Sequence, residues 1–353
     1  MMRIAIVNDV TLAVEALRSV VTSVPEYQIA WTASDGAEAV QKCAADIPDL
    51  ILMDLIMPRM DGAEASRRIM RESPCAILIV TATVEGHSSK VFEAMGWGAL
   101  DAVKTPVLLN SADPAPGSQL LAKIAMIGRL IGKTRSRRTR APSAPATSKP
   151  EQPGRPGFPL IAIGSSTGGP TAVARVLSGL PEDLNAAIAV VQHVDEIFAP
   201  GLASWLARES GRDVKIIARG DRVDPSFVQI ASTNDHLRLT PGLRLTYTEE
   251  PSDYSYRPSA DVFFQTVVNH WAGTAVGVLL TGMGDDGAKG LLAMRQAGWH
   301  TIAQSPETCI AYGMPKAAAK LGAAVEILPL DQIAGAISRV LSASASLSQR
   351  SRS

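Results

Sequence analysis

A serine-containing turn near the middle of the chain has the composition of a nucleophile site. Residues 160–170 read LIAIGSSTGGP, an apolar run followed by two serines, a threonine, two glycines and a proline. The segment 164–168 fits the pattern G-x-S-x-G, which places Ser166 on a sharp turn between a strand and a helix. The pattern alone also fits a plain turn or a phosphate-binding loop, although the lysine of a P-loop is missing. Ser166 is a candidate nucleophile that requires a base and an orienting acid elsewhere.

Two of the five histidines are candidates for the base. His193 ends the apolar run 186–193, so we expect it at the same sheet edge as Ser166. His236 follows another predicted strand and competes for the role, and a purely structural histidine is the alternative for either one. The strand-end position favours His193.

An acidic, glycine-rich turn supplies the orienting acid. Residues 277–290 read GVLLTGMGDDGAKG, in which Asp285 and Asp286 follow a short apolar run. The glycines allow tight backbone turns that can aim N–H groups at a developing oxyanion, whereas a solvated acidic turn or a cation-binding loop is the alternative. The order serine, histidine, aspartate differs from that of α/β-hydrolases, so the serine pattern does not indicate that fold.

A second group of polar residues follows successive strands near the start of the chain. It consists of Asn8, Asp9, Asp54, Thr81 and Lys104. In parallel α/β sheets, functional groups collect outside the carboxyl ends of the strands. Asp9 and Asp54 are suited to share a Mg²⁺ ion, while Thr81 and Lys104 are suited to bind phosphoryl oxygens on Asp54. Each residue alone is compatible with an ordinary loop, but their grouping favours a phosphorylation site.

Strands and helices must alternate to bring these residues to one edge. In the first half, apolar runs occur at 3–7, 28–33, 49–55, 76–82 and 99–105. Amphipathic segments such as 12–21, 36–45 and 62–72 separate them, and a final helix is predicted at 118–132. The α/β pattern predicts a flavodoxin-like, doubly wound parallel sheet of five strands.

The second half repeats this alternation with different motifs. Its apolar runs lie at 159–164, 186–193, 213–218, 227–232, 243–248, 274–282 and 299–304. Its predicted helices lie at 170–178, 199–210, 259–272, 287–297 and 331–342. We expect a second α/β domain with a mainly parallel sheet and some antiparallel strands within residues 228–248.

The segment 133–157, KTRSRRTRAPSAPATSKPEQPGRPG, has no hydrophobic periodicity. It cannot bury enough apolar surface to offset its ordering entropy, so it is predicted to be a flexible linker between domains at 1–132 and 158–346. A cationic patch for nucleic acid is the alternative, but no aromatic residues interleave with its basic ones.

The composition excludes several other classes of protein. The formal net charge of zero gives no overall field for nucleic acid, and no apolar run approaches the length of a membrane span. The three cysteines form no CxxC or Cys/His pattern, which argues against a zinc site or a disulfide framework and favours the cytoplasm. Residues 1–10 enter a strand pattern rather than that of a signal peptide.

The first domain resembles a response-regulator receiver, on the residues described above and on MDLIMPRMDG around Asp54. The resemblance implies that Asp54 accepts a phosphoryl group from a histidine kinase with Mg²⁺ as cofactor. The family's acidic pair corresponds to Asn8 and Asp9, and its hydroxyl and lysine correspond to Thr81 and Lys104. The sequence departs from the family at Asp101, where receivers often carry an aromatic switch residue.

The second domain, and the order of domains, resemble the chemotaxis protein-glutamate methylesterases, the CheB family. The resemblance rests on IAIGSSTGG, VVQHV, RPSADVFF, LLTGMGDDGA, AMRQAG and YGMPKAA. It implies Ser166 as nucleophile, His193 as base and Asp286 as orienting acid. The implied oxyanion donors are backbone N–H groups near Thr167 and Met283.

The resemblance implies a phosphorylation-activated, cytoplasmic hydrolase of glutamate methyl esters on methyl-accepting chemoreceptor-type proteins. Deamidation of glutamine is a further implied activity, and the esterase step needs no cofactor. Segments 7–18 and 53–77 are similar to a subgroup from alternative chemosensory systems. A receiver-gated binding or scaffold protein without catalysis is the alternative function. A DNA-binding regulator is disfavoured because no helix-turn-helix pattern follows residue 158.

Overall fold

The chain divides into two compact units, Met1–Pro145 and Ala146–Ser353. The computed structural model describes residues 1–82, 88–106, 117–132, 156–252, 254 and 256–350, and for residues 88, 89 and 344–350 it describes only the backbone. Most of the predicted linker, residues 133–155, lies outside the described residues, so the linker and its boundaries stay predictions.

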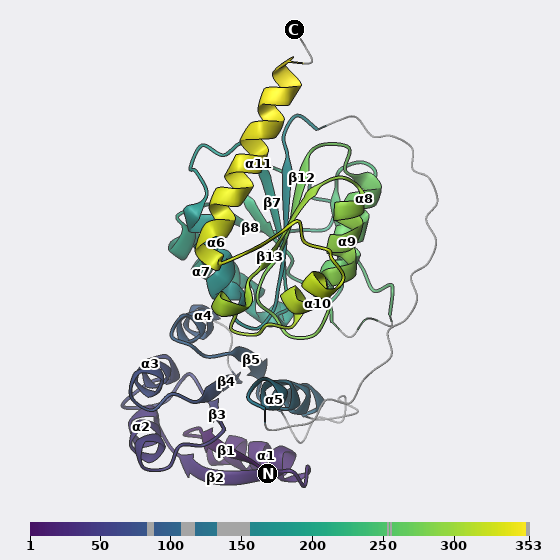
Figure 1. Cartoon of the computed structure of the whole chain (residues 1–353). Helices are drawn as coiled ribbons and strands as arrows, with labels where there is room; N and C mark the ends of the chain where they lie inside the picture. Colours follow the sequence, from purple (N-terminus) through teal and green to yellow (C-terminus); the bar gives the residue numbers. More distant parts are fainter. Residues whose placement is uncertain (83–87, 107–116, 133–155, 253, 255, 351–353) are drawn as a thin grey trace. The chain divides into compact units, whose positions relative to one another are not determined.

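The first unit contains a parallel five-stranded sheet with the strand order β2-β1-β3-β4-β5 (Figure 1). The strands are β1 (Met2–Val7), β2 (Tyr27–Ala33), β3 (Leu50–Met53), β4 (Ala76–Thr81) and β5 (Asp101–Lys104). The central strands β1, β3 and β4 are almost entirely buried, as expected where helices cover both faces of a parallel sheet. The doubly wound sheet predicted from the sequence is confirmed.

Five helices in the described part of the first unit flank this sheet. They are α1 (Thr11–Thr22), α2 (Gly36–Ala45), α3 (Gly62–Glu72), α4 (Ser88–Gly96) and α5 (Ser118–Leu130). Helices α1 and α5 lie on one face and α2, α3 and α4 on the other (Figure 1). Leu17 of α1 and Ile124 of α5 pack in one core cluster with Ile4 and Leu52 of the sheet, so the apolar stripes of these helices form that face of the core.

The second unit contains a seven-stranded sheet with the order β14-β13-β12-β6-β7-β9-β8, in which all neighbours pair in parallel. The strands are β6 (Leu160–Ser165), β7 (Ala187–Gln192), β8 (Val214–Ile216), β9 (Val228–Ile230), β12 (Ala275–Leu279), β13 (His300–Gln304) and β14 (Glu326–Leu328). The candidate nucleophile follows β6, which lies in the centre of the sheet between β12 and β7.

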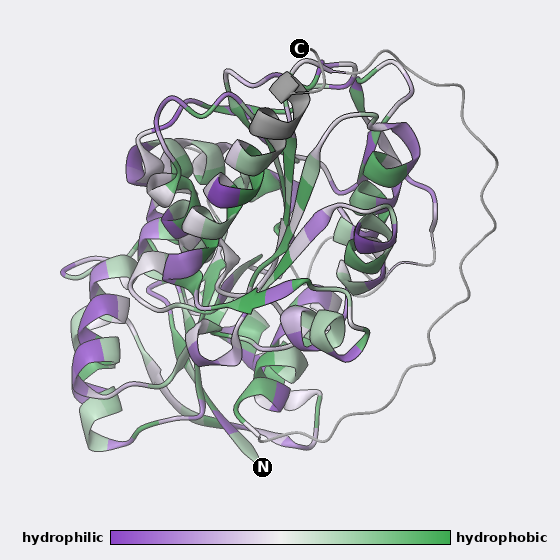
Figure 2. Ribbon diagram, turned by 45° about the horizontal axis from the view of Figure 1, so that its top comes forward, coloured by the Kyte–Doolittle hydropathy of each residue, from purple (hydrophilic) through white to green (hydrophobic). Residues whose placement is uncertain are grey.

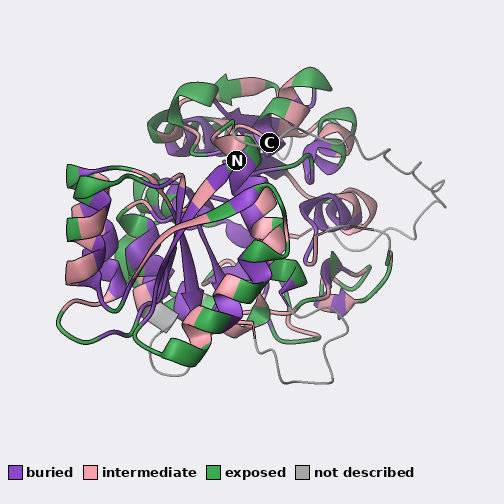
Figure 3. Cartoon of the chain, turned by 90° about the horizontal axis from the view of Figure 1, so that it is seen from below, coloured by how far each residue is buried: buried purple, intermediate pink, exposed green. Residues whose placement is uncertain are grey.

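Among the described residues of the second unit, six helices cover the two faces of its sheet. They are α6 (Gly169–Gly179), α7 (Ala199–Ser210), α8 (Ala260–His270), α9 (Ala288–Gln296), α10 (Met314–Lys320) and α11 (Leu330–Arg350), with short 3-10 turns η1 (Glu196–Phe198) and η2 (Pro306–Thr308). Helices α6, α7 and α11 lie on one face and α8, α9 and α10 on the other (Figure 1). The central strands β6, β7 and β12 are hydrophobic and buried, while polar, exposed residues lie on the outer sides of the helices (Figures 2 and 3).

The structure refines two sequence expectations for this unit. Within the described residues, β10 (His236–Leu239) and β11 (Leu245–Thr248) pair antiparallel, and an isolated antiparallel bridge joins Arg222 to Arg244. The buried segment Val228–Ile230 instead joins the parallel sheet as β9. Strands β10 and β14 and helix α10 were not predicted as separate elements, since four, three and seven residues are too short for a clear hydrophobic period. The expectation that His236 directly follows a strand is therefore wrong, because His236 begins β10. None of the helices in the described ranges combines the length and apolar character needed to cross a membrane.

Candidate active site

The turn after β6 holds Ser166 by its backbone. The Ser166 N–H donates to the Thr281 carbonyl at 3.0 Å, and the Ser166 carbonyl accepts from Gly169 N–H at 2.7 Å. Gly168 adopts φ 75°, a left-handed conformation that glycine reaches without strain. Gly282 approaches so closely that a β-carbon there would lie 2.8 Å from Ser166 Cβ. The β12 turn therefore packs directly against the serine turn.

The amide of Gln192 distinguishes the two adjacent serines. Its Oε1 accepts the Ser165 hydroxyl at 2.6 Å, and its Nε2 donates to the Ser166 carbonyl at 2.8 Å. The Ser165 hydroxyl therefore already donates its proton in a buried structural hydrogen bond. The Ser166 hydroxyl has no such partner among the described residues and is the one available for chemistry.

His193 and Asp286 meet at the same edge of the sheet, although 93 residues separate them. The register pairs Ser165 with Gln192, so Ser166 and His193 leave neighbouring strands side by side. His193 Nε2 lies 2.7 Å from Asp286 Oδ2, and both side chains are buried. The Nδ1 atom of His193 is buried and has no hydrogen-bond partner among the described residues, which leaves it as the nitrogen that can accept a proton from Ser166.

The carboxylate of Asp286 is held in its ionised form. Burial opposes its charge, but hydrogen bonds from His193, from the Ser259 hydroxyl and from Ala260 N–H outweigh burial and lower its pKa. The Ser259 Oγ to Asp286 Oδ1 distance is 2.6 Å, and Ala260 N lies 2.6 Å from Asp286 Oδ2. A fixed carboxylate of this kind selects the tautomer of the adjacent histidine and stabilises its protonated form.

The competing histidine, His236, occupies a different place. It is fully buried at the start of β10, and its Nδ1 accepts from Ser259 N–H at 3.1 Å. Its Nε2 donates to the Pro251 carbonyl at 3.0 Å, and burial lowers its pKa. Because both ring nitrogens are engaged with backbone groups, His236 holds the loop before α8 and has no nitrogen free for Ser166.

Two backbone N–H groups belong to the turns that pack together at Ser166 and Gly282. The N–H groups of Thr167 and Met283 have no acceptor within the described residues, so both can donate to an oxyanion. The Thr281 hydroxyl fixes this region by donating to the Thr167 carbonyl at 3.0 Å, and the Gln304 side chain accepts from Thr281 N–H at 2.8 Å. The predicted oxyanion donors therefore lie on backbone that buried side chains support.

The first unit gathers its predicted residues at the carboxyl edge of β1, β3, β4 and β5. Asp54 N–H donates to the Val7 carbonyl at 2.9 Å, and the register pairs Thr81 with Lys104. Burial, together with the charge of Asp9, raises the pKa of Asp54 to about 6, against hydrogen bonds from Leu55 N–H and Thr81. Such a carboxylate is stabilised by a positive charge nearby.

Asn8 takes a structural role at this edge. Its Oδ1 accepts from Val10 N–H at 2.8 Å and so forms the turn that leads into α1. In the described part of the chain, no cluster of three or more His, Cys, Asp or Glu side chains is arranged to hold a metal ion. Mg²⁺ binds through one or two carboxylates together with phosphate and water oxygens, and Asp9 and Asp54 supply two. The donor set fits a magnesium ion.

Each of the two units matches a known protein family. Residues 161–337 match the family model for the CheB methylesterase, and residues 4–111 match that for the response regulator receiver domain. The chain belongs to the CheB methylesterase family. This finding confirms the resemblance drawn from the motifs.

Close relatives of this CheB-family chain match nearly its whole length. Protein-glutamate methylesterase/protein-glutamine glutaminase 3 of Pseudomonas aeruginosa is 52% identical over 339 residues, covering 96% of this chain and 99% of that protein. The enzyme numbered 1 in Burkholderia lata is 53% identical over 338 residues, covering 95% and 98%. The crystal structure of the Thermotoga maritima CheB methylesterase catalytic domain is 34% identical, with a TM-score of 0.49, and the match covers 51% of this chain and 96% of that one.

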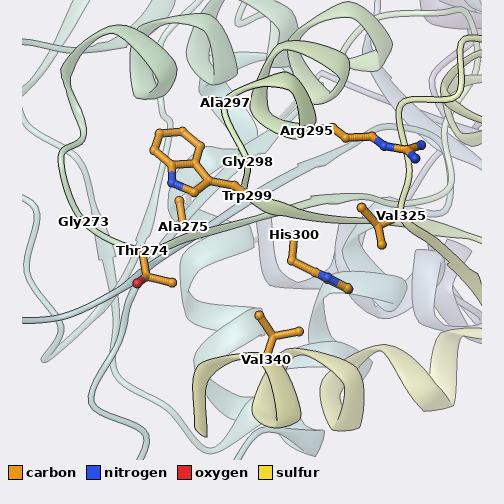
Figure 4. A pocket seen from close by; sticks show the side chains of 10 residues that line it. All are labelled: Gly273, Thr274, Ala275, Arg295, Ala297, Gly298, Trp299, His300, Val325 and Val340. Carbon is orange, nitrogen blue, oxygen red and sulfur yellow. The ribbon is translucent and has the colours of Figure 1, made fainter. Parts of the chain in front are cut away.

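A separate pocket of about 610 Å³ lies elsewhere in the CheB unit (Figure 4). Thr274, Ala275 and His300 line it, so it opens at the amino ends of β12 and β13. Two of its polar side chains already have partners: Arg295 donates to the Gly322 and Ala324 carbonyls, and His300 contacts Glu326 at 2.7 Å. The pocket lies at the sheet edge opposite to Ser166 and is not the active site.

Sequence reasoning missed three residues that support the site. Gln192 orients the serine turn, Ser259 contacts Asp286, and the Tyr256 ring stacks on His193 with centroids 4.5 Å apart. Gln192 directly precedes His193, and the other two lie in YRPSADVFF at or next to the quoted motif RPSADVFF. Motif membership was the available signal, but which partner each side chain contacts required the tertiary structure.

Proposed function

We propose that this CheB-family protein is a phosphorylation-activated protein-glutamate methylesterase and protein-glutamine glutaminase. Its substrates are methyl-accepting chemoreceptor-type proteins, and its phosphodonor is a cognate histidine kinase. The observation that carries the proposal is the 2.7 Å contact between His193 Nε2 and Asp286 Oδ2 beside the uncommitted hydroxyl of Ser166. The names of the two relatives agree with this activity.

In the proposed reaction, the hydroxyl of Ser166 transfers its proton to His193 Nδ1 as Oγ attacks the ester carbonyl carbon. The N–H groups of Thr167 and Met283 stabilise the oxyanion of the tetrahedral intermediate. His193 then returns the proton to the methoxy oxygen, the C–O bond breaks, and methanol leaves an acyl-enzyme. Asp286 stabilises the protonated ring throughout.

Water completes the cycle. A water molecule gives one proton to His193 and attacks the acyl carbon, after which the bond to Ser166 Oγ breaks and Oγ takes the proton back. The product is a receptor glutamate. A glutamine side chain follows the same steps with ammonia as the leaving group, which accounts for the second activity.

Regulation enters through Asp54. When Asp54 is phosphorylated, its phosphoryl oxygens would contact Thr81 and Lys104. A Mg²⁺ ion held by Asp9 and Asp54 would neutralise the negative charge of the phosphoryl group. Asp101, at the position of the receivers' aromatic switch residue, is buried and accepts from Lys123 Nζ of α5 at 2.5 Å. This ion pair connects β5 to α5. A conformational change of the receiver on phosphorylation must therefore occur without an aromatic side chain at position 101.

The test is methanol release from a methylated chemoreceptor preparation, with phosphodonor and Mg²⁺ present. The wild-type protein is expected to release methanol and Ser166→Ala is not. A non-catalytic scaffold protein is the alternative, and it would bind the receptor without releasing methanol. Equal release by the wild type and Ser166→Ala would also overturn the proposal.

A further inference from the structure

The two helices beside Asp286 cap each other. Asp286 comes just before α9, yet its carboxylate accepts hydrogen bonds at the amino end of α8, from Ser259 Oγ, Ala260 N–H and Asp261 N–H. Asp261, in the first turn of α8, accepts from Gly290 N–H of α9 at 2.7 Å. Each helix therefore supplies a carboxylate to the unpaired N–H groups of the other.

Close packing keeps this arrangement rigid. A β-carbon at Gly290 would lie 2.9 Å from the Asp261 carbonyl oxygen and 2.7 Å from Phe264 Cβ, so only glycine allows α8 and α9 to approach this far. Asp261 is buried, and burial and the charge of Asp286 raise its pKa to about 7. The position of the Asp286 carboxylate therefore depends on where α8 begins.

Ser259 is the residue that connects the start of α8 to Asp286. Its fully buried hydroxyl accepts from Val262 N–H at 3.3 Å, as an N-cap does, and donates to Asp286 Oδ1 at 2.6 Å. Its own N–H is fixed by His236 Nδ1 at 3.1 Å. On Oδ1 the Ser259 hydroxyl is the near donor and Asp261 N–H, at 3.3 Å, the distant one. On Oδ2 the contacts are His193 and Ala260 N–H, so the four groups together fix the rotation of the carboxylate.

We propose that Ser259 is a positioning residue of the esterase reaction: through its hydroxyl it aims the Asp286 carboxylate at His193. The proposal rests on the proposed function, because it assumes that Asp286 orients the base. Without the hydroxyl, buried Oδ1 keeps only the longer hydrogen bond from Asp261 N–H, so the carboxylate is held less firmly toward His193.

The test uses full-length protein, phosphodonor and a methylated receptor, with kcat and KM measured separately. Ser259→Ala and Ser259→Gly are expected to lower kcat about tenfold to a hundredfold, less than loss of the acid itself, with KM within about twofold. Glycine is nearly as good an N-cap as serine, so the glycine variant removes the donor while preserving the helix start. Ser259→Thr keeps the hydroxyl and is expected to retain more activity than the glycine variant.

Thr266→Val is the matched control on the same helix. The buried Thr266 hydroxyl accepts from Leu239 N–H and donates to the Phe263 carbonyl, away from Asp286. This variant is expected to lower the melting temperature without lowering kcat. A Ser259→Gly enzyme with wild-type kcat would overturn the positioning role, and so would an equal loss of kcat in Thr266→Val. In either case, turnover by the wild-type protein would still support the esterase proposal. If Ser166→Ala hydrolysed the ester as fast as the wild type, both proposals would fall.

Discussion

Two adjacent serines in the turn after β6 differ in what their hydroxyls contact. Ser165 donates to Gln192 in a fully buried bond, whereas Ser166 makes no such bond within the described residues. Ser166→Ala is therefore expected to abolish methanol release with little change in stability. Ser165→Ala is expected to retain activity but to lower the free energy of unfolding by about 1–3 kcal/mol, because Gln192 Oε1 loses its donor. Activity assays and denaturant melts of both variants check this pair, and an inactive Ser165→Ala would contradict the assignment of the nucleophile.

Substitutions of the two buried histidines are expected to differ in their effect on the rate of methanol release. His193→Gln should lower the rate by several orders of magnitude, because it removes the proposed base and its contact with Asp286. His236→Gln should cost far less in rate, because His236 acts on loop backbone through Ser259 and Pro251. Comparable losses in kcat from the two variants would mean that His193 is not the base.

Asp261 gives the second unit a pH-dependent stability. Burial, with the charge of Asp286, raises its pKa from 3.8 to about 7. Between these values the native state holds a proton that the unfolded state has lost, so stability falls as the pH rises from about 4 to about 7. Asp261→Asn keeps an oxygen for Gly290 N–H and removes this loss. The free energy of unfolding of the variant, relative to that of the wild type, is therefore expected to increase as the pH rises. Urea melts of both proteins at pH 4.5 and 7.5 measure this difference, and the same difference at both pH values would contradict the prediction.

At the scale of elements, the turn after β12 has to fit against the turn after β6. A β-carbon at Gly282 would lie 2.2 Å from Met314 Sδ and 2.8 Å from Ser166 Cβ. Gly282→Ala is therefore expected to displace the serine turn, which would lower kcat and destabilise the second unit by about 1–3 kcal/mol. Gly335→Ala in α11 is the control: its β-carbon meets no atom within 4 Å, and it should stabilise the protein by about 0.5–1 kcal/mol. A fully active Gly282→Ala would show that this contact does not position Ser166.

At the scale of the whole molecule, one chain holds the receiver near the esterase at a high effective concentration, so even a weak inhibitory interaction would be populated. Phosphorylation of Asp54 is expected to shift the receiver to a conformation that inhibits less. A fragment starting near residue 158 should then be more active than the unphosphorylated full-length protein, and phosphodonor should raise only the full-length activity. Equal rates for the fragment and the resting protein would refute inhibition while leaving the esterase proposal intact.

Asp54→Asn is the matched variant for this experiment. It removes the carboxylate whose pKa burial raises, and it is expected to prevent phosphoryl transfer from a small phosphodonor with Mg²⁺. Its full-length activity should stay at the resting level when phosphodonor is added. Stable phosphate incorporation into Asp54→Asn would show that another residue is the acceptor.

The sequence by itself determined most of the strands and helices and the family of this protein. Apolar runs bounded by turn residues locate β6, β7 and β12 because local burial and periodicity suffice to define a strand. The motif residues Ser166, His193 and Asp286 follow those strands, so their meeting at one edge could be predicted from the rule for parallel sheets.

Only the tertiary structure decided the contacts within that edge. The order β12-β6-β7 brings the turn at Asp286 beside His193, and no periodicity in the sequence encodes the order of strands. The choice of Nε2 over Nδ1, the commitment of Ser165 to Gln192, and the donor at Ser259 depend on distances between segments far apart in the chain. Hydrogen bonds act over about 3 Å, so they are determined only once packing has placed both partners.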